Sequence, residues 1–223
     1  MNLHFKIGWF TFLLTAAAGF CDTATFVAGN ETFSAHVTGN FIIFAAQAVL
    51  NGDSSAWVKL LTFPVFVFAV MAGGWLSNRT GRRYSLLLIE GIFLLIAGGL
   101  AFGTASAPAG NTIVVMLTVF GMGLQNAFGK LFGKETYGPT TMMTGNVTQA
   151  ALDLGHLLSR GSRTDNIAFE SIKKQVVLLG GFLAGCFLGG LLSKKIGLEA
   201  MLLPGLAVLV CYLAGKQATS RDA

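Results

Sequence analysis

Two copies of the tripeptide Thr-Gly-Asn, Thr38-Gly39-Asn40 and Thr144-Gly145-Asn146, carry the side chains of this sequence that are best suited to hold a small molecule. Thr and Asn cap the free N–H groups at a helix start, and Gly lets a ligand or another backbone come close. A helix start also carries roughly half a positive charge. We interpret the pair either as a substrate or selectivity site or as two structural caps, and both roles can hold together.

Ionisable residues within apolar segments are a second group of candidates, since such residues are costly in a membrane and face a partner or water. Asp22 is interpreted as a proton or cation relay, or as an acceptor for the N–H groups of the first short helix. Asp153 lies well inside the second short segment, where a solvated carboxylate or a pair with Arg160 is favoured over a relay. His36 is a candidate pH switch and, with Asp22 and Asp153, a candidate proton or ion relay.

Amide and acidic side chains in two other segments complete the set. Gln125 and Asn126 precede the second Thr-Gly-Asn motif, and their amides are predicted to bind substrate or to cap unwound backbone. Glu90 follows a basic turn, and we expect it to form an ion pair with Arg82 or Arg83.

No catalytic or metal motif accompanies these residues. The sequence has no Ser/His/Asp set, no His-Glu-x-x-His run and no phosphate-binding loop. Cys21, Cys186 and Cys211 lie in apolar runs without metal-ligand spacing, so we interpret them as small buried hydrophobic residues. We therefore expect a protein that is not an enzyme and that needs no metal or cofactor.

The composition requires lipid around most of the chain. Of its 223 residues, 53% are hydrophobic and 11% are charged, whereas about a quarter of the residues of a soluble domain are charged. The basic residues lie in short loops between apolar runs rather than on one face, which excludes a nucleic-acid-binding domain. The expected partners are the lipid bilayer and a small-molecule solute, with a homo-oligomer left open.

The apolar pattern predicts eight helical segments: Ile7–Ala28, Ser34–Leu50, Val58–Ser77, Ser85–Gly103, Asn111–Phe132, Thr141–Leu158, Lys174–Leu192 and Leu198–Leu213. A full crossing needs about 20 mostly apolar residues, and all but two segments satisfy this or come close. The exceptions are Ser34–Leu50 and Thr141–Leu158, which contain the Thr-Gly-Asn motifs and are shorter and more polar. We therefore predict an all-α integral membrane protein with about six transmembrane helices and two short polar helices.

The chain also repeats itself. Besides the Thr-Gly-Asn motifs, Gly73-Gly74-Trp75-Leu76-Ser77 parallels Gly189-Gly190-Leu191-Leu192-Ser193 at nearly the same spacing. The prediction is one membrane domain of two repeats, 1–104 with its short helix at about 34–50 and 105–223 with its short helix at about 141–158. Each repeat has three spans and one short helix, which inverts the second repeat relative to the first.

The positions of the basic residues bear on whether the short segments cross. If both dip into the membrane and return, with the N-terminus inside, twelve of the fifteen Lys and Arg are cytoplasmic and only Lys59, Lys194 and Lys195 lie outside. If all segments cross, the split is seven against eight. The bias argues for re-entry of the second short segment and the repeat extends this to the first, so both termini are expected in the cytoplasm.

Four motifs together carry a resemblance to a known family. They are Gly19 with Asp22, Thr38-Gly39-Asn40, Gly123-Leu124-Gln125-Asn126 and Thr140-Thr141-Met142-Met143-Thr144-Gly145-Asn146. In these motifs, and over nearly the whole chain, the sequence resembles the YoaK family of bacterial membrane proteins, also called domain of unknown function 1275. The resemblance implies a small protein of the bacterial cytoplasmic (inner) membrane with about six spans, and it implies no established activity.

These observations favour a permease or channel for a small polar or anionic solute, with a site near the membrane midplane where the two short helices start. Converging helix N-termini disfavour a bare inorganic cation there. The alternative is a non-transporting membrane scaffold or accessory protein, in which the polar segments are structural. The small residues Gly181, Gly185 and Gly189 share one helix face, which is expected to pack within the chain or, alternatively, against a second copy.

Overall fold

The computed structural model describes residues 3–50, 56–104, 108–159 and 166–219, and in these ranges the chain is helical without a β-strand. The elements in order are α1 (Leu3–Ala28), α2 (Gly39–Leu50), α3 (Trp57–Thr80), α4 (Ser85–Thr104), α5 (Pro108–Leu131), α6 (Met143–Ser159), α7 (Asn166–Ile196), the 3-10 turn η2 (Gly197–Met201) and α8 (Leu202–Thr219). Every segment predicted from the apolar pattern is present as a helix, so the all-α prediction is confirmed.

Two helix starts differ from the prediction. α2 begins at Gly39 rather than Ser34, because the N–H groups just before it bond to the Asp22 carboxylate instead of entering a helix. α7 begins at Asn166 rather than Lys174 and runs for 31 residues. Its first turns are polar and α7 packs against α6, so the apolar run marked only the later part of this helix.

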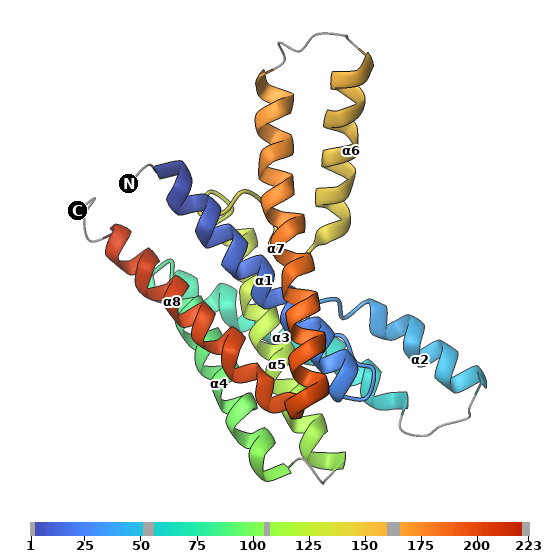
Figure 1. The fold of residues 1–223 in the computed structure, drawn as a ribbon. Coiled ribbons are helices and arrows are strands. Elements are labelled where there is room, and N and C mark those ends of the chain that lie inside the picture. Colours follow the sequence, from blue (N-terminus) through green and yellow to red (C-terminus); the bar gives the residue numbers. More distant parts are fainter. Residues whose placement is uncertain (1–2, 51–55, 105–107, 160–165, 220–223) are drawn as a thin grey trace.

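The helices form a bundle from which two arms extend (Figure 1). α1 and α7 make the most extensive contact, α5 packs against α3 and α4, and α8 packs against α4 and α1. α6 packs on α7 and α2 packs on α3; in Figure 1, α6 with the first part of α7 makes one arm and α2 makes the other. α1 packs against α7 and α5 packs against α3, while α6 packs on α7 and α2 packs on α3.

Glycines let α1 and α7 touch along their backbones. Gly181, Gly185 and Gly189 on α7 are buried. A Cβ at Gly185 would overlap the Ala16 carbonyl of α1, and one at Gly189 would lie 2.5 Å from the Phe20 carbonyl oxygen. The face formed by these three glycines therefore packs against α1 within the chain, which is the first of the two alternatives expected from the sequence.

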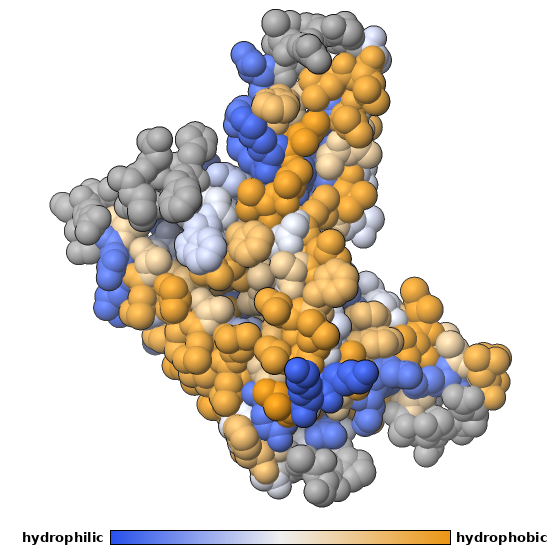
Figure 2. Space-filling view, in the orientation of Figure 1, coloured by the Kyte–Doolittle hydropathy of each residue, from blue (hydrophilic) through white to orange (hydrophobic). Residues whose placement is uncertain are grey.

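Five helical stretches are long and apolar enough to cross a membrane. They are Ile7–Ala28, Trp57–Thr80, Ser85–Gly103, Gly110–Leu131 and Asn166–Ala218, the last of which includes both α7 and most of α8. Hydrophobic residues cover most of the bundle face seen in Figure 2, and hydrophilic residues gather toward the ends of the helices. An apolar exterior of this extent indicates a membrane protein, whereas the number of six spans stays a prediction.

Tyr84 marks the end of the bundle at which α1 begins. Its ring lies 6.0 Å from the ring of Phe10 on α1, and its hydroxyl donates to Glu135, just after α5, at 2.5 Å. A Cβ at Gly215, near the end of α8, would lie 2.5 Å from the same ring, and Arg83 pairs with Glu135 at 3.0 Å. The start of α1, the turn between α3 and α4, and the ends of α5 and α8 therefore share one end of the bundle.

The expected pairing of Glu90 with Arg82 or Arg83 is wrong. Glu90 is 0% exposed, and neither of its carboxylate oxygens has a hydrogen-bond partner among the described residues. Side chains on one helix meet at separations of three or four residues. Glu90 lies beyond that reach and inside the bundle, while Arg83 finds Glu135 at the bundle end.

The contact between α1 and α7 predicts the effect of Gly185→Ala. The added methyl group meets the backbone of α1, so we expect the free energy of unfolding in detergent to fall by about 1–3 kcal/mol. Gly180→Ala is the matched control on the same helix, because nothing lies within 4 Å of a Cβ at Gly180. The control should change stability by less than about 0.5 kcal/mol, and equal effects of the two substitutions in denaturant unfolding would contradict this packing.

Candidate functional site

Asp22 fixes the non-helical segment between α1 and α2. Its side chain is buried, and Oδ1 accepts hydrogen bonds from the N–H groups of Ser34 at 2.9 Å, Ala35 at 2.6 Å and His36 at 3.3 Å. Oδ2 faces Nδ1 of His36. The expectation that Asp22 accepts N–H groups at the first short helix is met in the segment that leads into it, while the relay role stays a prediction.

His36 is the titratable group of this pair that water can reach. It lies between α1 and α2, outside the stretches long and apolar enough to cross a membrane. The hydrogen bond with Asp22 raises the pKa of His36 above its usual value, and burial acts in the opposite direction. The His36 side chain keeps 34% of its surface exposed, whereas that of Asp22 keeps 5%.

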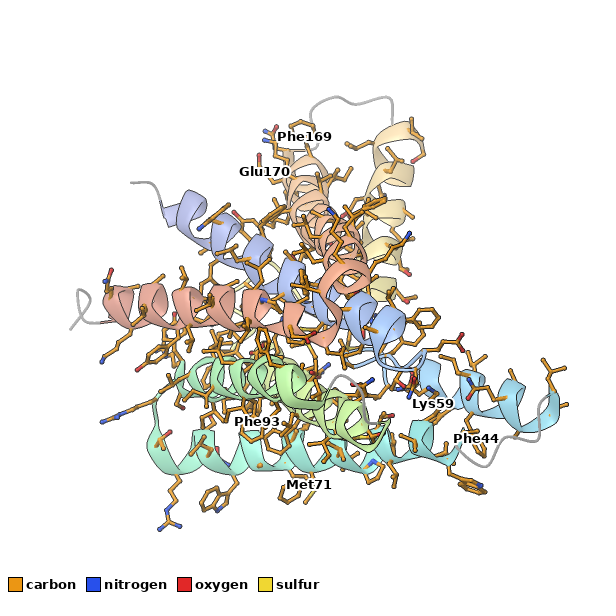
Figure 3. The ribbon with its side chains drawn as sticks, turned by 60° about the horizontal axis from the view of Figure 1, so that its bottom comes forward. Phe44, Lys59, Met71, Phe93, Phe169 and Glu170 are labelled. Atoms are coloured by element: carbon orange, nitrogen blue, oxygen red, sulfur yellow. The ribbon has the colours of Figure 1, made fainter. Side chains whose placement is uncertain are left out.

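Asn40 holds the same segment from the start of α2. Its Oδ1 accepts from the Phe33 N–H at 2.8 Å, and its Nδ2 donates to the Phe33 carbonyl at 2.8 Å and to Thr62 Oγ1 at 3.0 Å. Lys59 donates to Thr32 Oγ1 at 2.8 Å, and Figure 3 shows it where α1, α2 and α3 meet. Thr62 and Lys59 both belong to α3, which therefore supports the segment as well.

The second Thr-Gly-Asn motif repeats this arrangement at the start of α6. Asn146 Nδ2 donates to the Pro139 carbonyl at 2.9 Å, so both Asn side chains bond to a carbonyl seven residues earlier. Pro139 has no N–H group, and the second half therefore lacks a counterpart of the bond from the Phe33 N–H to Asn40. Asn40 and Asn146 are both buried.

The non-helical segment between α5 and α6, residues 132–142, is held by amide side chains on α5, as the segment between α1 and α2 is held by Asp22 on α1. Gln125 Nε2 donates to Thr140 Oγ1 at 2.9 Å and to the Leu14 carbonyl of α1 at 2.8 Å, and Asn126 Nδ2 donates to Thr141 Oγ1 at 2.8 Å. Gln125 Oε1 is buried and has no hydrogen-bond partner among the described residues. Two neutral amides thus stand where the first half has a carboxylate.

Both segments reach the middle of α7. Leu178 lies 3.2 Å from the Cβ position of Gly138 in the second segment, and the Phe182 ring lies 5.5 Å from the His36 ring in the first. Leu178 and Phe182 are about one helical turn, or roughly 5.4 Å, apart. The structure therefore brings the two segments that lead into the Thr-Gly-Asn helix starts to neighbouring turns of α7, and the depth of these segments in the membrane stays a prediction.

The polar groups of the two motifs differ in exposure. Thr38, Thr144 and Gly145 are exposed, and Gly39 is half-buried beside the Phe33 ring. Nothing lies within 4 Å of a Cβ at Gly145. The two hydroxyls and the Gly145 backbone are therefore open to a ligand, whereas the Asn amides are occupied within the chain.

Asp153 does not join the helix starts. It lies two turns beyond Asn146 on α6, about 10 Å along the axis, and its Oδ1 accepts from Gln149 Nε2 at 2.9 Å. Its expected partner Arg160 lies outside the described residues. In the described ranges, no group of three His, Cys, Asp or Glu residues could hold a metal ion.

The Asp22–His36 pair predicts a pH dependence of stability. Because the folded-state pKa of His36 is raised, the protonated pair stabilises the fold fully below the unfolded pKa of about 6.5, and this contribution is lost as the pH rises through the folded pKa. Thermal unfolding in detergent should therefore lose stability across this window in the wild type and less in His36→Gln. His156→Gln, an exposed histidine on α6, is the control and should keep the wild-type slope. Identical slopes for wild type and His36→Gln would refute the pair's role.

One family model matches the chain over residues 10–214, and its description is a protein of unknown function, DUF1275. No curated protein and no solved structure matches the chain. The family match confirms the resemblance drawn from the Thr-Gly-Asn and Gln-Asn motifs. Since the match covers nearly the whole length, the chain belongs to the DUF1275 family.

Proposed function

We propose that this protein is a permease or channel of the bacterial cytoplasmic membrane for a small polar or anionic solute. The observation that carries the proposal is the pair of non-helical segments, each ending in a buried Asn that bonds a carbonyl seven residues earlier, which approach each other on α7. Irregular backbone inside an apolar bundle is characteristic of solute sites at broken or half helices.

The chain direction supports two re-entrant segments. α1 begins at the bundle end marked by Tyr84, and α3 finishes at the same end. The chain thus leaves along α1 and returns along α3, so α2 adds no net crossing. α5 and α8 also finish at this end. Since α8 runs back to it, α7 must begin there and run away from it. The chain between α5 and α7 therefore returns to the end it left, and α6 adds no net crossing either.

Helix packing supports an inverted repeat with halves 1–104 and 105–223. A Cβ at Gly19 of α1 would overlap the Phe182 carbonyl oxygen of α7, and a Cβ at Gly123 of α5 would lie 3.1 Å from the Phe66 carbonyl oxygen of α3. Phe66 and Phe182 have the same separation in the chain as the two Gly-Gly-x-Leu-Ser matches. Equivalent glycines therefore meet equivalent carbonyls.

Charge supports cytoplasmic termini. The end of the bundle that holds Tyr84 also carries the basic residues in the last turns of α3, α5 and α8, which are Arg79, Lys130 and Lys216. The opposite end carries Lys194 and Lys195 in the last turn of α7. By the positive-inside rule, the more basic end faces the cytoplasm.

The difference between the two helix starts supports the class of solute. The Asp22 carboxylate already occupies the N–H groups before α2, so that start has its own anion. The start of α6 has neutral amides behind it and the exposed Thr144 and Gly145 in front. Its N-terminal dipole favours an anionic or strongly polar group of the solute.

The second candidate is a membrane scaffold or accessory protein without transport. It is favoured by one observation, the full use of the Asn40 amide in bonds to Phe33 and Thr62. Neither candidate includes a catalytic step.

Gly145→Asp separates the two candidates. A carboxylate at the start of α6 should repel an anionic solute and lower its flux into liposomes at least about tenfold, equivalent to about 1.4 kcal/mol. Gly155→Asp is the matched control, because both glycines are exposed on α6 with nothing within 4 Å of a Cβ. The measurement is uptake of a panel of labelled small anions and polar metabolites by reconstituted, folded protein.

Three results are decisive for this experiment. Flux of at least one panel solute that falls in Gly145→Asp and not in Gly155→Asp supports the site. Equal flux in both variants places the site elsewhere. If folded wild-type protein moves no solute of the panel, the permease proposal is refuted and the scaffold is the remaining candidate.

A further inference from the structure

Glu90 is a carboxyl group in the core of the bundle that the proposed site does not use. It lies on α4, is 0% exposed, and has no hydrogen-bond partner on either oxygen in the part of the chain that the structure describes. Asp22, the other fully enclosed carboxyl of the first half, accepts three backbone N–H groups and faces His36. Backbone N–H groups can therefore compensate a negative charge on Asp22, and no described hydrogen-bond donor can do so for Glu90.

The surroundings of Glu90 offer no positive charge. α5 approaches it through Gly121, whose Cβ position lies 3.7 Å from Glu90 Cγ. Two buried thiols, those of Cys21 on α1 and Cys211 on α8, are near enough for a charge on Glu90 to act on them. Neither carboxylate oxygen is hydrogen-bonded to a charged side chain of the described ranges.

A charged carboxylate at this position is strongly unfavourable, because no described donor replaces the hydration that burial removes. A proton removes that cost, because a neutral carboxylic acid is far less costly to bury than a carboxylate. A structural role gives no reason for the acid, since an apolar residue of similar volume packs a membrane bundle more stably. Intramembrane acids of this kind mark proton or ion pathways.

We infer that Glu90 is a proton-binding site, occupied in this closed arrangement of α1, α4, α5 and α8 and emptied when the helices part and water enters. A group that binds a proton in one conformation and releases it in another couples proton movement to that change. The coupling to a solute rests on the proposed permease function. In that function, Glu90 makes solute movement depend on the proton gradient. The step is a proton transfer: an O–H bond of hydronium breaks as the O–H bond of the Glu90 carboxylic acid forms, and release to water reverses it.

Infrared spectroscopy of the purified wild-type protein tests the site without any solute. At neutral pH we expect the carbonyl stretch of a protonated carboxylic acid, and we expect Glu90→Gln to lose it. Glu170→Gln is the control, because Glu170 is an exposed acid at 2.6 Å from Lys173 and should not contribute to this band. Wild-type protein without the band, or a band that survives in Glu90→Gln, overturns the proton site.

A second variant covers the case in which Glu90→Gln does not fold. Glu90→Asp keeps the acid and moves it by one methylene, so the band should shift. An unshifted band in Glu90→Asp overturns the assignment to Glu90.

Transport under a pH gradient tests the coupling. For a panel solute that the wild type moves, a tenfold proton gradient should drive up to about tenfold accumulation at one proton per solute. Glu90→Gln should lose the accumulation and keep solute exchange at equal pH. Accumulation by Glu90→Gln at the wild-type level overturns the coupling and leaves the proton site standing. Folded protein that moves no solute refutes the permease together with the coupling, and the infrared result then decides the proton site alone.

Discussion

Backbone that leaves helical geometry inside an apolar bundle must have its N–H and C=O groups bonded by the protein, and this constraint shapes both halves of the chain. Ten residues separate α1 from α2, and eleven separate α5 from α6. In the first segment Asp22 and Asn40 supply the missing partners from the two flanking helices. In the second, Asn146 performs the same task at the start of α6, and Gln125 and Asn126 on α5 bind the threonine hydroxyls.

The same constraint explains why so much of the fold was visible in the sequence. Every helix follows from its apolar run, and the paired Thr-Gly-Asn motifs marked both helix starts. The segment before α2 was predicted to be helical from residue 34. Asp22 was expected to accept N–H groups of a helix that starts there, and the sequence did not reveal that it holds Ser34 and Ala35 in non-helical backbone before the helix begins. The start of α7 was predicted too late, since its polar turns find their partner in α6 and not in lipid.

The candidate site was only partly accessible to such reasoning. Asp22, His36, Gln125 and Asn126 were chosen because polar groups in apolar runs need a reason, and the structure gives each of them a bond to one of the two segments or within it. Their partners, such as Phe33, come from tertiary packing and from backbone atoms that carry no sequence signal. The repeat also concealed an asymmetry, because a carboxylate in one half and two amides in the other leave the helix starts electrostatically unlike.

Glu90 was placed wrongly because proximity in sequence to Arg82 and Arg83 outweighed its position in an otherwise apolar run. The more informative signal was that no basic residue lies within four positions of it on α4, so its charge has no local partner. Cys21 lies within electrostatic reach of both Glu90 and Asp22, which sets the two acids in one region of the bundle. Three backbone N–H groups converge on Asp22, whereas no hydrogen-bond donor of the described residues reaches Glu90.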